Sequence, residues 1–290
     1  MVIVGSGAEM LKTFQDVWAR SEQRPSREAP PGILHGLGAI HEMVSGAPPT
    51  VGPEELRRRS CEAFVELFEG TDHLVLGEEQ LPETSGHVFI MNHLSNHPAN
   101  VLANGFIPTL DTHFVSAMIL FKKYGEPPVR VVRKSNPGEE AHQKYYDRLS
   151  HIYVEPGCTN PAKYRLRATA EERRRPFLEE AGRHLREARN VVICPEGDST
   201  GTDTSPLPFK AGAFRLAASV RPEPLLVPIA VANFDKETTR TRTVAAVHEP
   251  IRLSEHIGET FDDRSLHGFI NDYVHERFRR YVREAVRLAG

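Results

Sequence analysis

Apolar residues are grouped along this chain in short runs that alternate with charged and turn-forming residues. A run that is apolar at every position, instead of at alternate positions, is typical of a strand buried on both faces of a parallel sheet. The runs HVFIM, VVIC and LLVPIAVA, at residues 87–91, 191–194 and 225–232, have this character. Further strands are predicted at residues 73–76, 112–120, 129–132, 152–154 and 244–247.

Segments with helical spacing of apolar residues lie between these runs. Pro53 and the two acids after it suit the first turn of a helix that places Leu56 and Phe64 on one face and ends at Gly70. Other helices are predicted at residues 171–189, 209–218 and 265–288, with shorter ones around residues 14–18 and from Pro98 toward residue 105.

The order of these elements predicts the fold class. Because strands alternate with helices, we expect an α/β fold with a mostly parallel central sheet flanked by helices. Residues 1–70 are expected to form a small helical N-terminal extension, and residues 71–290 the α/β domain.

Composition and charge narrow the class of protein. A net charge of −3 without a basic stripe argues against nucleic-acid binding. No apolar stretch reaches the ~18–20 residues of a membrane helix, and the first residues lack the pattern of a signal peptide. The three cysteines contain no CxxC pair, so neither a disulfide framework nor a zinc site is favoured. We therefore expect a cytoplasmic protein without a metal ion or a bound cofactor.

The first candidate site is the segment NHLSNHPAN, which follows the predicted strand 87–91. In an open α/β sheet, ligands collect beyond the carboxyl ends of the strands. His93 stands there, near a helix N-terminus whose positive end favours the neutral imidazole, the form that can take a proton from a hydroxyl. The alternative interpretation is that His93 and His97 only form hydrogen bonds that hold a loop.

The second candidate site is the segment PEGDST, which follows the predicted strand 191–194. Gly197 permits a tight turn whose backbone N–H groups could bind an oxyanion, and Glu196 could anchor the loop or orient a substrate hydroxyl. Lys210, in the segment FKAGAF, could meet a phosphate or a carboxylate. The alternative is a polar loop with a glycine turn and a solvated lysine.

Taken in order, several blocks of the sequence resemble the glycerolipid acyltransferase superfamily, the lysophosphatidic acid and glycerol-3-phosphate acyltransferases of phospholipid biosynthesis. The blocks are LVLGEEQLPETSGHVFIMNH, ICPEGDST, PFKAGAF, LLVPIAVANFD and VHEPIRL, and the resemblance runs from about residue 70 to 285. The long gap between the first two blocks resembles the soluble plastid-type glycerol-3-phosphate acyltransferases more than the short membrane-bound members.

The resemblance implies transfer of a fatty acyl group from a thioester of coenzyme A or acyl carrier protein to an acceptor hydroxyl, without a covalent enzyme intermediate. His93 would be the general base, with Asn92, His97 and Glu196 as further catalytic candidates. The partners would be the acyl donor and a small-molecule or lipid acceptor, and a peripheral contact with a membrane stays open. The implied substrate-binding residues are Asn96, Gly197, Asp198, Ser199, Thr200, Lys210 and Arg133.

The chain departs from the family pattern in two places. The family pairs its histidine with an aspartate five residues later, where this chain has Pro98. Asn96, Asn100 or a backbone carbonyl could accept the imidazole N–H as neutral partners, and Asp111 and Asp198 are carboxylate candidates from more remote positions. The arginine of the Pro-Glu-Gly-Thr-Arg-Ser block is missing, and the Phe-Ile-x-Arg block has no clean match, although Arg133 lies in a basic segment before it. These changes predict an acceptor other than glycerol phosphate, such as an uncharged or cationic hydroxyl or amine.

Two other functions compete with an acyltransferase that uses His93. A catalytically silent family member that binds acyl chains or acyl carrier protein would account for the missing aspartate and arginine. An unrelated enzyme of the α/β-hydrolase type carries the least weight, because we expect no Gly-x-Ser-x-Gly elbow in this chain.

Overall fold

The computed structural model describes residues 32–155, 170–238 and 240–290. Residues 32–290 form one compact unit. The helix expected around residues 14–18 lies outside the described residues. Within the described part, no helix is long and apolar enough to cross a membrane.

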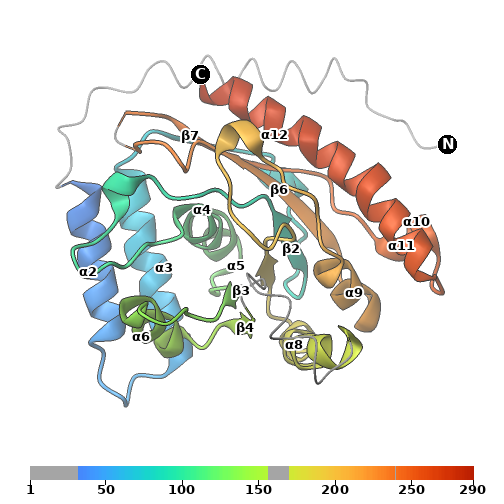
Figure 1. Ribbon diagram of the computed structural model, residues 1–290, viewed down its shortest axis with the longest axis horizontal. Coiled ribbons are helices and arrows are strands. Elements are labelled where there is room, and N and C mark those ends of the chain that lie inside the picture. Colours follow the sequence, from blue (N-terminus) through green and yellow to red (C-terminus); the bar gives the residue numbers. More distant parts are fainter. Residues whose placement is uncertain (1–31, 156–169, 239) are drawn as a thin grey trace. The chain divides into compact units, whose positions relative to one another are not determined.

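A seven-stranded sheet forms the centre of this unit, with the strand order β1-β7-β6-β2-β5-β3-β4 (Figure 1). Neighbouring strands are parallel except for the pair β6 and β7, which is antiparallel. The predicted α/β fold with a mostly parallel central sheet is therefore confirmed. The strands are β1 His73–Leu76, β2 Val88–Met91, β3 Val129–Arg133, β4 Ile152–Val154, β5 Val191–Ile193, β6 Leu226–Ala232 and β7 Thr243–Val247.

Helices cover both faces of the sheet, which explains why its central strands are apolar at every position. In β2, Phe89 and Met91 point to one core cluster, and Val88 and Ile90 point to the other. All four side chains are fully buried. Burying both faces in this way leaves only the strand ends for polar chemistry.

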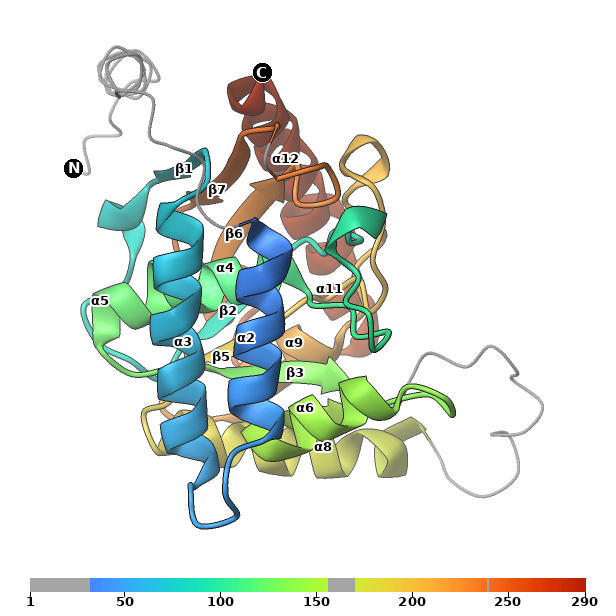
Figure 2. The ribbon, with the colours of Figure 1, turned by 90° about the vertical axis from the view of Figure 1, so that its left-hand side faces the viewer.

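The first layer of helices comes from the N-terminal half of the chain and the second from the C-terminal half (Figures 1 and 2). The first layer contains α2 Ile33–Ser45, α3 Pro53–Glu69 and α6 Glu140–Leu149. The second contains α8 Ala170–Arg186, α9 Gly212–Ser219, α10 Leu253–Ile257, α11 Asp263–Gly268 and α12 Glu276–Ala289. Helices α2 and α3 share a core cluster with β2 and β6, so the boundary expected after residue 70 does not separate compact units.

The strand predicted at residues 112–120 is wrong. The chain is helical there, as α4 Leu110–Phe114, the π-helical segment Val115–Phe121 and α5 Lys122–Tyr124. Residues 114 to 120 are almost fully buried and pack against α3, so the side chains are apolar around the helix except for Ser116. Such a helix has the same continuous apolar pattern as a buried strand. The helix expected from Pro98 onward is only a 3-10 turn, Pro98–Asn100.

The connections after β2 and β5 leave the sheet toward opposite faces. The chain after β2 leads to α4, which belongs to the first helical layer, and the chain after β5 leads to α9, which belongs to the second. Because β2 and β5 are parallel neighbours, the two loops that follow them lie side by side at the carboxyl edge of the sheet. The two candidate segments found in the sequence are these two loops.

Candidate active site

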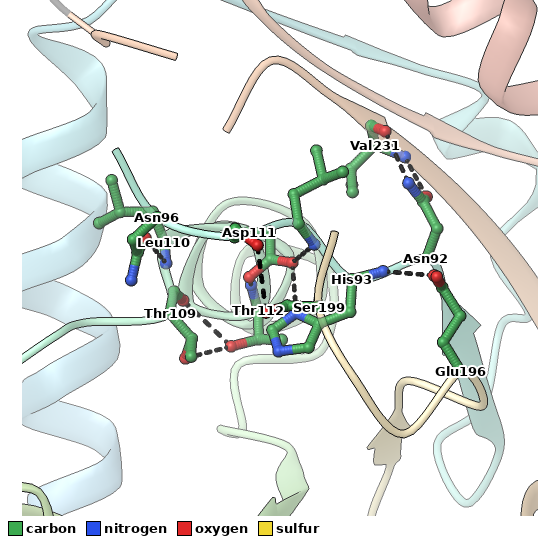
Figure 3. Close-up of polar contacts among 12 residues, drawn as sticks. Asn92, His93, Asn96, Thr109, Leu110, Asp111, Thr112, Glu196, Ser199 and Val231 are labelled. Carbon is green, nitrogen blue, oxygen red and sulfur yellow. Dashed lines mark hydrogen bonds and ion pairs between the residues drawn. The ribbon is translucent and has the colours of Figure 1, made fainter. Parts of the chain in front are cut away.

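His93 is hydrogen-bonded to an aspartate from the helix that follows its loop (Figure 3). Its Nδ1 lies 2.7 Å from Oδ2 of Asp111, 18 positions later in the sequence. The Asp111 side chain is fully buried, whereas the imidazole is 20% exposed. With the Nδ1 proton donated to Asp111, Nε2 is left as the proton acceptor. Nε2 forms no hydrogen bond within the described part of the chain.

Asp111 is itself held by two backbone N–H groups. The amide of Leu94 donates to Oδ2 over 2.8 Å, and the amide of Thr112 donates to Oδ1 over 2.7 Å. Asp111 also lies in the first turn of α4, where the helix dipole favours a negative charge. The carboxylate is therefore fixed in position and oriented toward the imidazole without a second side chain.

The pKa of His93 is raised above its usual value of 6.5. Burial by itself lowers this pKa, but the charge of Asp111 and the hydrogen bond to it outweigh burial, and Glu196 and Asp198 add to the increase. This differs from the neutral imidazole expected at a helix N-terminus, because the helix end carries Asp111, and a carboxylate at 2.7 Å acts more strongly than the helix dipole. The imidazole is accordingly a stronger base than an isolated histidine.

Glu196 ties the two candidate loops together. Its Oε1 accepts the backbone N–H of His93 over 2.7 Å, and its Oε2 accepts that of Leu207 over 2.6 Å. Burial raises the pKa of Glu196 to about 7, against the effect of these two backbone hydrogen bonds. Because both oxygens are occupied by the backbone, Glu196 positions His93 and is not placed to exchange protons with a substrate.

The loops after β2 and β5 are further joined through their backbones. The amide of Thr200 donates to the carbonyl of His93 over 3.1 Å, and the amide of Ser95 donates to the carbonyl of Thr200 over 2.9 Å. The hydroxyl groups of Ser95 and Ser199 lie 3.3 Å apart. Asp198 accepts a hydrogen bond from the amide of Ser199, so the segment 198–200 is shaped by local hydrogen bonds next to His93.

Asn92, Asn96 and His97 were catalytic or binding candidates, and the structure shows each in a hydrogen bond that shapes the backbone. Asn92 is fully buried and bonds the N–H and the carbonyl of Val231, which fixes the end of β2 against β6. Asn96 bonds the carbonyl of Pro108 and closes the loop that leads to Asp111. His97 accepts the amide of Ala99 at the start of the short turn 98–100. None of the three contacts the imidazole of His93.

Arg133 lies at the end of β3 and is engaged by an acid. Its two terminal nitrogens lie 2.5 and 2.7 Å from the two oxygens of Glu139. This bidentate pair holds the pKa of Glu139 at about 2. An anionic substrate would therefore have to compete with Glu139 for the guanidinium of Arg133.

A family model described as Acyltransferase matches residues 73–232, which is more than half of the chain and includes both candidate loops. The chain belongs to the acyltransferase family. This confirms the resemblance to glycerolipid acyltransferases that the sequence blocks indicated. The expected donor, acceptor and catalytic base go beyond what a family match shows.

Among solved structures, the acyltransferase chain is similar to the crystal structure of the 1-acyl-sn-glycerophosphate (LPA) acyltransferase PlsC from Thermotoga maritima. The two chains share 15% sequence identity with a TM-score of 0.45, and the similarity covers 93% of this chain and 88% of that chain. No curated protein matches the sequence of this acyltransferase.

One motif next to the acyltransferase site was overlooked in the sequence. The segment 197–201 matches the letters Gly-x-Ser-x-Gly of a hydrolase elbow. However, no helix follows it directly, since α9 begins at Gly212, and no hydrogen bond joins Ser199 to His93. The strand–elbow–helix context of that motif is therefore absent from this described segment.

A buried arginine, Arg130, braces the helix that carries Asp111. Its terminal nitrogens donate to the hydroxyl of Thr112 and to Nε2 of His113, each over 3.1 Å, and its Nε donates to His151 over 3.2 Å. Burial first, and then the charge of Arg130, lowers the pKa of both histidines well below 6.5, so they stay neutral and accept these hydrogen bonds. Arg130 thus supports Asp111 through its neighbours on α4.

Gly197 and Lys210 are in close contact, and this contact gives a testable prediction. Gly197 has a φ angle of 66°, and a Cβ atom there would lie 2.4 Å from Nζ of Lys210. We expect Gly197→Ala to lower the free energy of unfolding by about 1–2 kcal/mol, because alanine is strained at this positive φ angle. The new Cβ atom should also displace the side chain of Lys210. Denaturant unfolding and the KM for both substrates measure the two effects.

Gly125→Ala is the matched control for this substitution. Gly125 has a φ angle of 72°, and nothing lies within 4 Å of a Cβ atom built on it. We expect a similar loss of stability from Gly125→Ala without a change in KM. Equal KM values for the two variants would show that the position of Lys210 has no part in substrate binding.

Proposed function

We propose that this acyltransferase moves an acyl group from a thioester to an acceptor hydroxyl, with His93 as the general base. The observation that carries the proposal is the 2.7 Å pair between Nδ1 of His93 and the buried Asp111, which leaves Nε2 available at the carboxyl edge of the sheet. A histidine whose far nitrogen is held by a carboxylate is the usual arrangement for taking a proton from a nucleophile.

The reaction follows from this geometry. Nε2 accepts the proton of the acceptor hydroxyl while its oxygen attacks the carbonyl carbon of the thioester. The tetrahedral adduct collapses with cleavage of the C–S bond, and the thiolate leaves with the bonding electrons. The imidazolium, stabilised by Asp111, then returns its proton to the thiolate or to solvent. No protein nucleophile takes part, and the donor is a thioester of coenzyme A or acyl carrier protein.

The complete histidine–aspartate pair supports an enzyme over a silent binding protein. The silent alternative was motivated by the missing aspartate, where Pro98 stands, and by the missing arginine. Asp111 pairs with His93 from a different position, so the first of these two motives loses its weight.

The charges around the pair favour an acceptor without a phosphate group. Asp198 stands near the position of the arginine in the family block, and its charge contributes to the raised pKa of His93. Arg133 is already paired with Glu139. A phosphate brought to this edge would meet a carboxylate and a guanidinium that is already satisfied. We therefore propose an uncharged or cationic hydroxyl or amine as the acceptor.

A screen of donors and acceptors tests the proposed function. Acyl-CoA and acyl carrier protein thioesters are combined with glycerol-3-phosphate, a lysophospholipid, and neutral and cationic alcohols and amines, and products are identified by mass spectrometry. We expect transfer to a neutral or cationic acceptor, and an intact-mass spectrum without acylated protein. Selective turnover of glycerol-3-phosphate would overturn the proposed acceptor class, and a stable acyl-enzyme would overturn the direct mechanism.

A further inference from the structure

A groove lies away from His93, on the second helical layer. It has a volume of about 690 Å³ and lies between α8, α9 and the segment 261–263 that leads into α11. Its lining includes four arginines and two large apolar side chains, namely Arg174, Arg175, Arg186, Arg215, Leu178 and Phe261.

Positive charge exceeds negative charge in this groove, although the chain as a whole has a net charge of −3. The four arginines face two carboxylates, Glu179 and Asp263. Arg215 pairs with Asp263 over 2.6 Å, but its Nε is buried and has no hydrogen-bond partner. Arg174, Arg175 and Arg186 form no ion pair with residues 32–155, 174–238 or 240–290. Several guanidinium groups are thus available to a ligand.

The spacing of these arginines indicates the size of the ligand. Arg174 and Arg186 are 12 positions apart on α8, which corresponds to roughly 18 Å along a helix. Arg215 approaches from α9. A single phosphate cannot reach groups so far apart, whereas a ligand with phosphates at two places along its length can.

The other lining residues indicate the body of the ligand. Leu178 and Phe261 contribute apolar surface to a groove that is otherwise basic. Arginine binds phosphate oxygens in a bidentate manner, and its flat guanidinium also stacks on aromatic rings. A nucleotide with more than one phosphate group offers both partners, because it has phosphates for the arginines to bind and an aromatic base for them to stack on.

We propose that this groove binds the phosphorylated nucleotide end of coenzyme A, and so holds the acyl donor while its thioester reaches His93. This inference rests on the proposed function, and it selects coenzyme A over acyl carrier protein as the carrier. Arg215 lies on α9, the helix that follows the loop containing Glu196 and Lys210, so the chain leads from this loop into the groove. The pantetheine arm of coenzyme A extends from the nucleotide end toward the thioester.

Direct binding tests the inference without requiring turnover. Free coenzyme A and adenosine 3′,5′-bisphosphate are titrated into the full chain by isothermal calorimetry. The groove variant is Arg174→Glu/Arg186→Glu. The control is Arg280→Glu/Arg283→Glu on α12, which makes the same change in charge at two exposed positions. Circular dichroism and thermal melting check that both variants are folded.

We expect the groove variant to weaken both ligands by about tenfold or more, because removing a charge-assisted hydrogen bond weakens binding by at least this factor. The control should bind both ligands as the wild type does. The groove variant should also raise the KM for acyl-CoA with little change in kcat. The inference is overturned if the wild type does not bind coenzyme A, or if both double variants weaken binding equally.

The outcomes separate this inference from the proposed function. His93→Ala should bind coenzyme A like the wild type, because His93 is outside the groove. Turnover of acyl carrier protein thioesters without binding of coenzyme A would leave the proposed function intact and remove the inference. Binding of coenzyme A in the groove without any acyl transfer would support the inference and remove the proposed function.

Discussion

Replacing His93 by alanine is expected to lower kcat by a factor between about a hundred and ten thousand, the range that a positioned general base contributes. The KM for both substrates should change little, because the imidazole acts on the hydroxyl proton in the transition state. Steady-state kinetics with the best donor and acceptor from the screen measure both constants. The variant should remain folded, since the backbone N–H and carbonyl of residue 93 keep their partners, Glu196 and Thr200.

His35→Ala is the control for this substitution, because His35 is an exposed histidine on α2. It should retain wild-type kcat. If His93→Ala also retained wild-type kcat, the base would have to be another group, and the proposed mechanism would be wrong.

Asp111→Asn should lower kcat by about a hundredfold or more. In the wild type, Oδ2 accepts hydrogen bonds from His93 and Leu94, and Oδ1 accepts one from Thr112. An asparagine has one acceptor oxygen and a donor amide group, so at least one of these donors would face an N–H group. The imidazole would then lose either its orientation or the tautomer that leaves Nε2 free.

The pH dependence gives a second measure of the same substitution. The neutral form of His93 is the active one, so activity should fall as the pH falls through its pKa, which is above 6.5 in the wild type. Removing the charge of Asp111 removes the main cause that raises this pKa. The acidic limb of kcat/KM should therefore move to lower pH in Asp111→Asn.

Asp72→Asn provides the matched control, because Asp72 is an exposed carboxylate that pairs with Arg242. It should leave both kcat and the acidic limb in place. An acidic limb at the same pH in Asp111→Asn and the wild type would show that the observed titration does not belong to His93.

The position of the site could be predicted from the sequence, because buried parallel strands have a distinctive composition. HVFIM and VVIC are apolar at every position, and they become neighbouring central strands, β2 and β5. Once both are buried on two faces, the polar residues that follow them have to meet at one edge. The meeting of His93 and Glu196 follows from this rule.

The same pattern offered Asp111 and Asp198 as carboxylate partners of His93 but could not choose between them. Sequence spacing predicts contacts within one helix or turn, and Asp111 reaches His93 across a loop that closes through Asn96 and Pro108. The misassigned segment 112–120 hid the helix to which Asp111 belongs. A signal was present in Thr109 and Asp111 after Pro108, since small polar and acidic residues after a proline often mark the start of a helix.

The role of Glu196 was also beyond the sequence. A glutamate beside a glycine turn can bind a substrate or anchor a loop, and the residue type does not distinguish the two. Only the backbone amides of His93 and Leu207, which occupy both of its oxygens, decide in favour of anchoring.

The 18-residue separation of His93 and Asp111 has a consequence for how the surroundings of this pair can vary. In a motif with a short fixed spacing, any insertion between histidine and carboxylate breaks the pair. Here one residue follows a strand end and the other lies at a helix start, and the segment between them is held by Leu94, Leu102 and Phe106, which belong to the core. Its exposed positions, Ala99, Val101 and residues 103–105, are where side chains can change without disturbing either member of the pair.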